Sequence, residues 1–144
     1  MNRALFKSKN SEWATPAWLY ERLNAEFHFD FDPCPLGSTE DGLATLFNPW
    51  AGKRVFCNAP YGPQISKWLR RAEDADLAVY LIPARTDTQW FHTLVLPKAS
   101  EIRFVQGRLK FGKHQDPAPF PSLIAIFDKS VLSCQKVTAL KAKP

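Results

Sequence analysis

The sequence predicts an α/β protein with a mostly parallel sheet of about five strands and helices on its faces. Short apolar runs alternate with segments in which apolar residues recur every three or four positions, the pattern of strands separated by helices. One run, residues 77–83, is apolar at nearly every position, as in strands from the middle of a parallel sheet. The 144 residues, 45% of them hydrophobic, fit a single domain over 1–144.

The first predicted element is a helix that follows a polar N-terminal arm. Residues 1–12 are expected to form this loose arm. The helix is expected to begin at Thr15 and Pro16, because threonine is a good cap and proline suits the first helical position. Its apolar face is formed by Leu19, Leu23 and Phe27.

Two strands are expected next. Phenylalanine alternates with polar residues over 27–32, which predicts a strand that is broken at Pro33. A glycine- and proline-containing loop over 36–52 is followed by a second, short strand at 53–58. So few residues separate the two strands that little room remains for additional strands between them.

The second half of the chain continues the alternation. Helices are predicted over 63–75 and 86–96, and strands over 77–83, 101–105 and 122–127. The second of these helices is expected to be capped by Thr86 or Asp87. A long, basic, proline-rich loop over 106–121 has the length of loops that carry function. The basic segment 135–144 is expected to be frayed.

Polar segments follow three of the predicted strands. They are "DPCPLG" (32–37), "NAPYG" (58–62) and "PARTDT" (83–88). Because the carboxyl ends of parallel strands meet at one edge of a sheet, these segments are expected to converge on one crevice. Open α/β sheets bind their ligands at this edge.

Composition narrows the class of protein. No run of 18 apolar residues predicts a membrane span, and the N-terminus is not expected to be a signal peptide. The cysteines Cys34, Cys57 and Cys134 are expected to be reduced thiols of a cytoplasmic protein, and the three histidines have no metal-binding spacing. The net charge of +5 and pI of about 9.2 permit a polyanionic partner without proving one.

The stretch "VFCNAPYG" ends a predicted strand with groups that a plain turn does not require. The amide oxygen of Asn58 and the adjacent main-chain carbonyl form a pair of acceptors for an exocyclic NH2 group, which they help toward tetrahedral geometry as it attacks. Pro60 fixes the turn, and the ring of Tyr61 offers a face to a flipped planar base. The alternative is a capping Asn58, a simple β-turn over 60–62 and a core tyrosine.

Four stretches in order resemble the phage-type DNA N6-adenine methyltransferases, the phage Dam family. They are "EWATPAWLYERLNAEFHFDFDPCP", "VFCNAPYGPQISKWLRRA", "LIPARTDTQWFH" and "EIRFVQGRLKF…APFPSLIAIF", about nine-tenths of the chain. The resemblance implies a trimmed Rossmann-like fold and S-adenosylmethionine as the methyl donor. It also implies transfer to the N6 amine of a flipped-out adenine in DNA, with "NAPY" matching the family motif Asp/Asn/Ser-Pro-Pro-Tyr/Phe.

The resemblance also implies the site residues. The catalytic residues are Asn58, Ala59, Pro60 and Tyr61. The cofactor-binding residues are Trp13, Thr15, Pro16, Asp32, Pro33, Cys34 and Gly37. The DNA-binding candidates come from their positive charge and their loop positions, not from the resemblance; they are Arg85, Arg108, Lys110 and Lys113. The candidate for the ribose contact is Glu40 or Asp41, and no metal is expected.

Some of these assignments have simpler alternatives. Asp32 could simply be a turn residue before Pro33. Arg85 could be a surface residue beside a helix cap, and the cations of the 106–121 loop could be solvated without contacting DNA. Ala59 departs from the proline of the family motif. Its carbonyl is still available, but its φ is not fixed by a ring, which puts the rate in doubt more than the reaction type.

Other functions stay open at this point. They are methylation of cytosine N4, methylation of a protein glutamine amide, and binding of DNA or cofactor by a weak or inactive relative. The expected partner is double-stranded DNA, in the cytoplasm of the host cell if a phage encodes the protein. Bases are expected to be read by the 105–121 loop and the strand-end loops, because no separate recognition domain fits in the chain.

Overall fold

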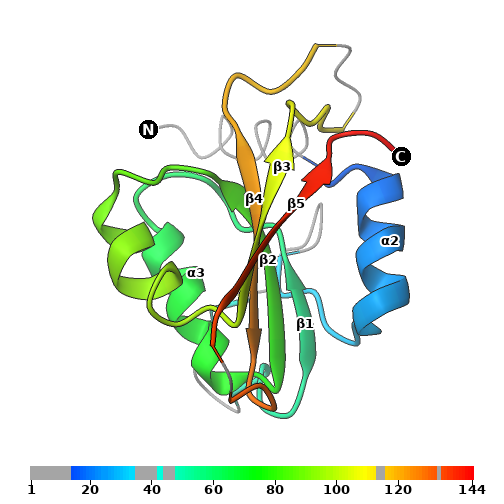
Figure 1. The fold of residues 1–144 in the computed structure, drawn as a ribbon. Helices are drawn as coiled ribbons and strands as arrows, with labels where there is room; N and C mark the ends of the chain where they lie inside the picture. Colours follow the sequence, from blue (N-terminus) through cyan, green and yellow to red (C-terminus); the bar gives the residue numbers. More distant parts are fainter. Residues whose placement is uncertain (1–13, 35–41, 44–47, 113–115, 133) are drawn as a thin grey trace.

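The computed structural model describes residues 14–34, 42–43, 48–112, 116–132 and 134–144. Its elements are α2 (Ala17–Phe27), β1 (Arg54–Cys57), α3 (Ile65–Arg70), the 3-10 turn η1 (Arg71–Asp74), β2 (Leu77–Pro83), the π-helical turn η2 (Phe91–Val95), β3 (Glu101–Gln106), β4 (Ser122–Asp128) and β5 (Lys136–Lys141). The sheet lies between α2 on one side and α3 with η2 on the other (Figure 1). No helix in the described ranges has the length and apolarity to cross a membrane.

The sheet has the strand order β1-β2-β4-β3-β5. Its five strands, counted over the described residues, match the predicted number. The prediction of a mostly parallel sheet is wrong, because β1–β2 and β3–β5 are parallel whereas β4 is antiparallel to both β2 and β3. The long connection after β3 turns the chain back, so that β4 inserts between its two neighbours. The carboxyl ends of the other four strands still point to one end of the molecule (Figure 1).

The segment 27–32 is not the strand that its alternation predicts. Helix α2 continues into it and ends at His28, which has a left-handed φ of 53° and donates its backbone N–H to the Asn24 carbonyl at 2.8 Å. Only Phe31 pairs with Val55 of β1, as an isolated parallel bridge. The alternating phenylalanines pack against the two apolar clusters on either side of the sheet instead of extending the ladder.

Both predicted helix caps are wrong. Pro16, not Thr15, occupies the N-cap of α2, and its carbonyl accepts two N–H groups of the first turn at 3.1 Å each. The hydroxyl of Thr88 accepts an N–H of the later helix at 3.3 Å, in the place predicted for Thr86 or Asp87. In both cases the helix begins further along the chain than the sequence pattern indicated.

The predicted apolar faces are confirmed except that Phe27 is only half-buried, and the strand predicted over 77–83 is a buried interior strand, although β4 beside it is antiparallel. The buried helical residues are Leu19 and Leu23 in α2, Ile65, Trp68 and Leu69 in α3, and Ala72 in η1. All seven residues of β2 are buried. Burial on both faces explains why this strand reads as a continuous apolar run.

The C-terminal segment 135–144 is not frayed, because most of it forms β5 in parallel register with β3. Its position at the sheet edge leaves charged side chains exposed, which conceals the strand in the sequence. Glu101 Oε2 joins the two strands by accepting from Arg103 Nε at 2.7 Å and from Thr138 Oγ1 at 3.0 Å. Arg103 also binds both carboxylate oxygens of Glu26 in α2, at 2.7 and 2.6 Å.

Loss of the Arg103 charge is expected to destabilise the protein. The side chains of Arg103 and Glu101 are only 17% and 16% exposed, so Arg103→Met leaves a shielded carboxylate without its cation. Methionine keeps an apolar stem over the Phe27 ring, which the guanidinium carbon covers at 5.3 Å. The free energy of unfolding in urea is expected to fall by about 1–3 kcal/mol.

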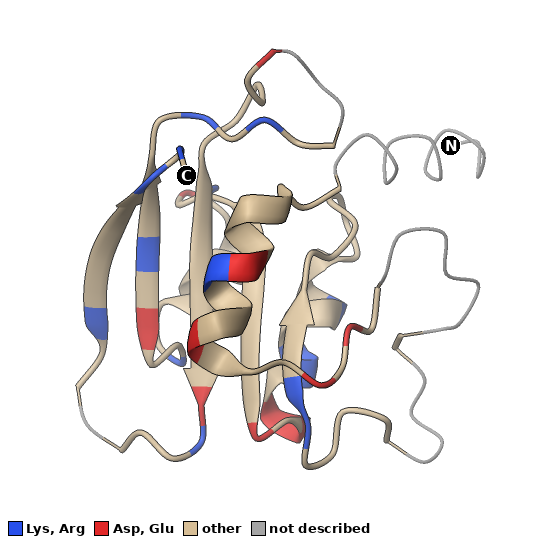
Figure 2. Ribbon diagram, turned by 90° about the vertical axis from the view of Figure 1, so that its right-hand side faces the viewer, with Lys and Arg blue, Asp and Glu red and all other residues tan. Residues whose placement is uncertain are grey.

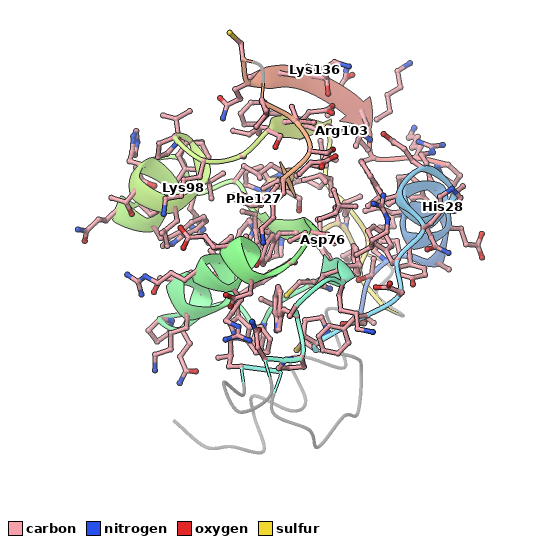
Figure 3. All side chains as sticks on the ribbon, turned by 90° about the horizontal axis from the view of Figure 1, so that it is seen from below. His28, Asp76, Lys98, Arg103, Phe127 and Lys136 are labelled. Atoms are coloured by element: carbon pink, nitrogen blue, oxygen red, sulfur yellow. The ribbon has the colours of Figure 1, made fainter. Side chains whose placement is uncertain are left out.

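The matched control is Lys98→Met, which breaks the ion pair of Lys98 with Glu73. Figure 3 shows Arg103 close to Lys136 of β5 and Lys98 well apart from it, beside the helical layer. The control pair is 46% and 69% exposed, so its loss is expected to cost about 0–1 kcal/mol. Equal losses in the two variants would contradict a stabilising role for Arg103.

Candidate active site

The segments that follow Phe31, β1 and β2 lie at one edge of the sheet. Phe31 pairs in parallel with Val55, and Cys57 pairs in parallel with Tyr80, so the chain leaves all three segments in the same direction. The N-terminal end of α2 and the connection between β3 and β4 lie at this same end of the molecule (Figure 1). The strand-end segments that the sequence singled out are therefore neighbours.

Asn58 is the first residue after β1 and is half-buried. Its amide nitrogen, Nδ2, donates to the hydroxyl oxygen Oγ1 of Thr15 at 3.1 Å. The bond joins residues 43 positions apart and brings the predicted catalytic motif to the predicted cofactor motif. In this arrangement the amide oxygen of Asn58 lies on the side away from the threonine.

The turn after Asn58 is fixed at both ends. Ala59 is only 2% exposed and belongs to the apolar cluster between the sheet and α3, and Pro60 is half-buried. Gly62 has a φ of 132°, a conformation that L side chains rarely adopt. Its carbonyl accepts the N–H of Ile65 at 3.2 Å, where α3 begins. The motif thus lies between a buried strand and a buried helix face.

Tyr61 packs against two aromatic side chains from the connection between β3 and β4. Its ring is nearly perpendicular to those of Phe111 and Phe120, with centroid distances of 6.4 and 5.2 Å. Burial, with a smaller effect of Cys57, raises the pKa of Tyr61, so its hydroxyl stays protonated at neutral pH. The residue as a whole is half-buried, and its hydroxyl oxygen is buried. Tyr61 therefore packs at the border of the core, which is close to the simple alternative of a core tyrosine.

Asp32 opens the turn that follows Phe31. Its Oδ1 accepts the backbone N–H of Cys34 at 2.9 Å. Burial raises the pKa of Asp32, and this hydrogen bond only partly offsets the effect. Burial and then the charge of Asp32 raise the pKa of Cys34 to about 11, which favours the protonated thiol at neutral pH. Pro33 between them is buried.

Gly42 packs against this turn and Trp50 binds Gly42, and neither residue was predicted from the sequence. A Cβ atom on Gly42 would lie 1.9 Å from the Pro33 carbonyl oxygen, so only glycine permits the contact. Trp50 is fully buried, donates its Nε1–H to the Gly42 carbonyl at 2.8 Å and stacks on Tyr80. The available signal was a large apolar residue within a segment interpreted only as loop.

The basic connection between β3 and β4 is held in place by a buried leucine and by hydrogen bonds within the connection. Leu109 is fully buried, whereas Arg108 and Lys110 on either side of it are exposed. The Ala118 N–H donates to the Leu109 carbonyl at 2.8 Å, and Arg108 Nη1 donates to the Ala118 carbonyl at 3.2 Å. Figure 2 shows the resulting basic stretches at the end of the molecule where the strand-end segments lie.

The remaining predicted site residues are less informative. Arg85 is exposed after β2, and its carbonyl accepts the Thr88 hydroxyl at 2.7 Å, as expected for a residue beside a helix cap. Trp13, Gly37, Glu40, Asp41 and Lys113 lie outside the described residues. Within the described ranges, no group of three or more His, Cys, Asp or Glu residues has the arrangement of a metal site.

A surface hollow of about 370 Å³ lies at the opposite end of the sheet. It is bordered by Lys98 and Phe127, both labelled in Figure 3, and by Val131. Phe127 pairs with Ala78 near the beginning of β2, so this hollow does not coincide with the strand-end segments.

Comparison with known proteins identifies the family. The family described as DNA N-6-adenine-methyltransferase (Dam) matches residues 3–129, which include Thr15, Asn58 and Tyr61. A protein named DNA N-6-adenine-methyltransferase, from Haemophilus phage HP1 (strain HP1c1), is 24% identical over 140 residues, covering 85% of this chain and 81% of its own length. The chain therefore belongs to the DNA N-6-adenine-methyltransferase (Dam) family, a family of adenine-specific DNA methyltransferases.

Proposed function

We propose that this protein transfers a methyl group from S-adenosylmethionine to the N6 amine of a flipped-out adenine in double-stranded DNA, at the carboxyl end of β1. The observation that carries the proposal is the hydrogen bond between Asn58 and Thr15. It joins the two motifs that the family resemblance assigns to catalysis and to the cofactor. The neighbouring position of Tyr61 at the same strand end adds a ring face for a base.

Asn58 would act on the attacking amine. In the transfer the N6 nitrogen would form a bond to the methyl carbon of the donor, the bond from that carbon to sulfur would break with its electrons staying on sulfur, and one N6 proton would pass to solvent. Acceptance of the N6–H bonds by the Asn58 amide oxygen and by the adjacent backbone carbonyl draws the nitrogen lone pair out of the ring system. The bond from Nδ2 to Thr15 supports this role, because it turns the oxygen end of the amide away from the threonine.

S-adenosylmethionine supplies an electrophilic methyl group when it is bound. The turn at Asp32 fits such a ligand, because a half-buried carboxyl at a strand end is an acceptor for hydroxyl or ammonium groups. Close packing of Gly42 on Pro33 holds this turn in place. The parallel arrangement of Phe31, β1 and β2 is that expected of a trimmed Rossmann-like sheet.

Tyr61 would receive the extruded base. Phe111 and Phe120 hold its ring by edge-to-face contacts, so the ring is already oriented before DNA arrives. A preoriented ring costs little conformational entropy when a base stacks on it. The exposed cations Arg108 and Lys110 lie on the same connection as these two phenylalanines, so phosphate contacts and base capture would be coupled.

The experiment that tests this function offers labelled S-adenosylmethionine to DNA and, separately, to protein acceptors. Label in DNA is expected, because the net charge of +5 and the outward-facing Arg108 and Lys110 favour a nucleic acid over a protein amide. Label only in protein would contradict the proposal in favour of glutamine methylation. Binding of DNA and cofactor without any transfer would identify an inactive relative.

Asp32→Ala is expected to weaken cofactor binding by roughly 10- to 100-fold, the loss typical of a hydrogen bond to a charged group. Calorimetry with S-adenosylmethionine in the absence of DNA measures the effect. Asp30→Ala is the matched control, because the Asp30 carboxylate also accepts a backbone N–H, from Arg54 at 2.8 Å, but is exposed. Equal affinity in the Asp32 variant and the wild type would exclude Asp32 as a cofactor ligand.

Charge reversal at Arg108 and Lys110 is expected to reduce the salt dependence of DNA binding. Each phosphate contact contributes about 0.9 to the slope of log affinity against log salt, so the double variant should lose about 2. Lys67→Glu with Arg70→Glu makes the same charge change on the exposed face of α3 and is the control. A slope that changes only in the control would locate the DNA elsewhere.

A further inference from the structure

We propose that the Thr15 hydroxyl is a positioning group for Asn58, which holds the amide with its oxygen directed at the target amine. The inference rests on the proposed function of Asn58. It goes beyond the cofactor role that the resemblance suggests for Thr15. The two roles act together: while the Thr15 hydroxyl donates its proton to the cofactor, its oxygen can only accept, and this selects the NH2 end of the Asn58 amide.

The need for such a group follows from the chemistry of an asparagine side chain. The amide nitrogen and oxygen are nearly equal in size, so rotation by half a turn about the last side-chain bond exchanges a donor for an acceptor at little steric cost. A rotated Asn58 would direct its NH2 group at the N6 amine, donor against donor. In the structure Thr15 Oγ1 binds the Nδ2 end of the amide, so the productive orientation is already present before DNA binds.

The backbone on both sides of Thr15 is held in place, so that its hydroxyl has a fixed position. The Ala14 carbonyl accepts the N–H of Gly112 at 2.8 Å, which ties this segment to the basic connection. On the other side, buried Pro16 is the N-cap of α2, which is anchored by the fully buried Leu19. A positioning group is effective when its own location is determined by packing in this way.

The test compares Thr15→Val with Thr15→Ser. Valine keeps the shape of threonine without the hydroxyl, whereas serine keeps the hydroxyl without the methyl group. At saturating DNA and cofactor, the single-turnover rate of Thr15→Val is expected to fall roughly tenfold, the equivalent of one hydrogen bond. Thr15→Ser is expected to restore most of the rate. A loss that disappears at saturating cofactor would overturn the inference, because Thr15 would then act on cofactor binding alone.

Repeating the Thr15 substitution in an Asn58→Asp variant distinguishes a positioning role of Thr15 from a packing role. Asn58→Asp replaces the amide by a carboxylate, whose two oxygens are equivalent, and aspartate is one of the residues found in the family motif. Because half a turn of a carboxylate changes nothing, Thr15→Val should reduce the rate clearly less in this background than in the wild type. The same loss in the wild-type and the Asn58→Asp backgrounds would show that Thr15 acts through packing, and would overturn the inference.

Failure of this inference is distinguishable from failure of the proposed function. A wild-type protein that transfers no methyl group contradicts the proposed function, whereas an active wild type with an unimpaired Thr15→Val variant contradicts only the inference. The side-chain NH2 signals of Asn58 provide a readout that needs no turnover. In 15N-labelled protein these protons are expected to exchange faster with solvent in Thr15→Val than in the wild type, and unchanged exchange would overturn the inference.

Discussion

Asn58→Ala is expected to reduce turnover by about 10²- to 10³-fold, the loss seen when one preorganised polar group is removed from a transition state. The amide oxygen binds the N6–H more strongly as the nitrogen becomes tetrahedral, so the loss falls on the chemical step. DNA and cofactor affinities, measured separately, are expected to stay within a small factor of wild type. Asn58→Asp is the control that keeps an acceptor at this position.

Two results would contradict this assignment. Full methylation by Asn58→Ala would mean that the end of β1 is only a turn, as the simple alternative proposes. A loss of cofactor affinity that matched the loss of turnover would give Asn58 a role in binding instead.

Tyr61→Ala is expected to weaken capture of the flipped base by about 1–3 kcal/mol, the value of stacking one base on an aromatic side chain. The measurement is the fluorescence rise of 2-aminopurine at the target position, which should be smaller in the variant. Tyr61→Ala also removes the contacts with Phe111 and Phe120, so some loss of stability is expected as well.

Tyr61→Phe separates the two effects of the ring. It keeps the ring face and its aromatic neighbours, and burial already keeps the hydroxyl of Tyr61 protonated. Most activity and the full fluorescence rise are expected to remain. A Tyr61→Phe variant as impaired as Tyr61→Ala would mean that the hydroxyl, and not the ring face, is the functional group.

The sequence predicted those parts of the fold that depend on burial. The apolar run of β2 and the helical faces of α2 and α3 are patterns that water exclusion imposes locally. Strand direction was not predictable in the same way, because the placement of β4 between β2 and β3 depends on contacts distant in the sequence. β5 was missed because an edge strand with exposed lysines has no apolar signature.

The candidate site was likewise predictable only where the signal is local in the sequence. The sequence pointed to Asn58 and Thr15 separately, through a strand end and a motif, but their hydrogen bond could not be predicted because it spans 43 positions. Gly42 and Trp50 were missed for a related reason. A glycine in a loop has no local signature, and its importance depends on the approach of Pro33 from another segment.

The central claim is that Asn58, held by Thr15 at the end of β1, promotes methylation of adenine N6. The most direct measurement is mass spectrometry of the nucleosides from DNA that has been methylated by the wild type, by Tyr61→Phe and by Asn58→Ala, and then digested. N6-methyladenine is expected from the first two proteins and almost none from the third. N4-methylcytosine as the product, or equal N6-methyladenine from Asn58→Ala, would contradict the claim.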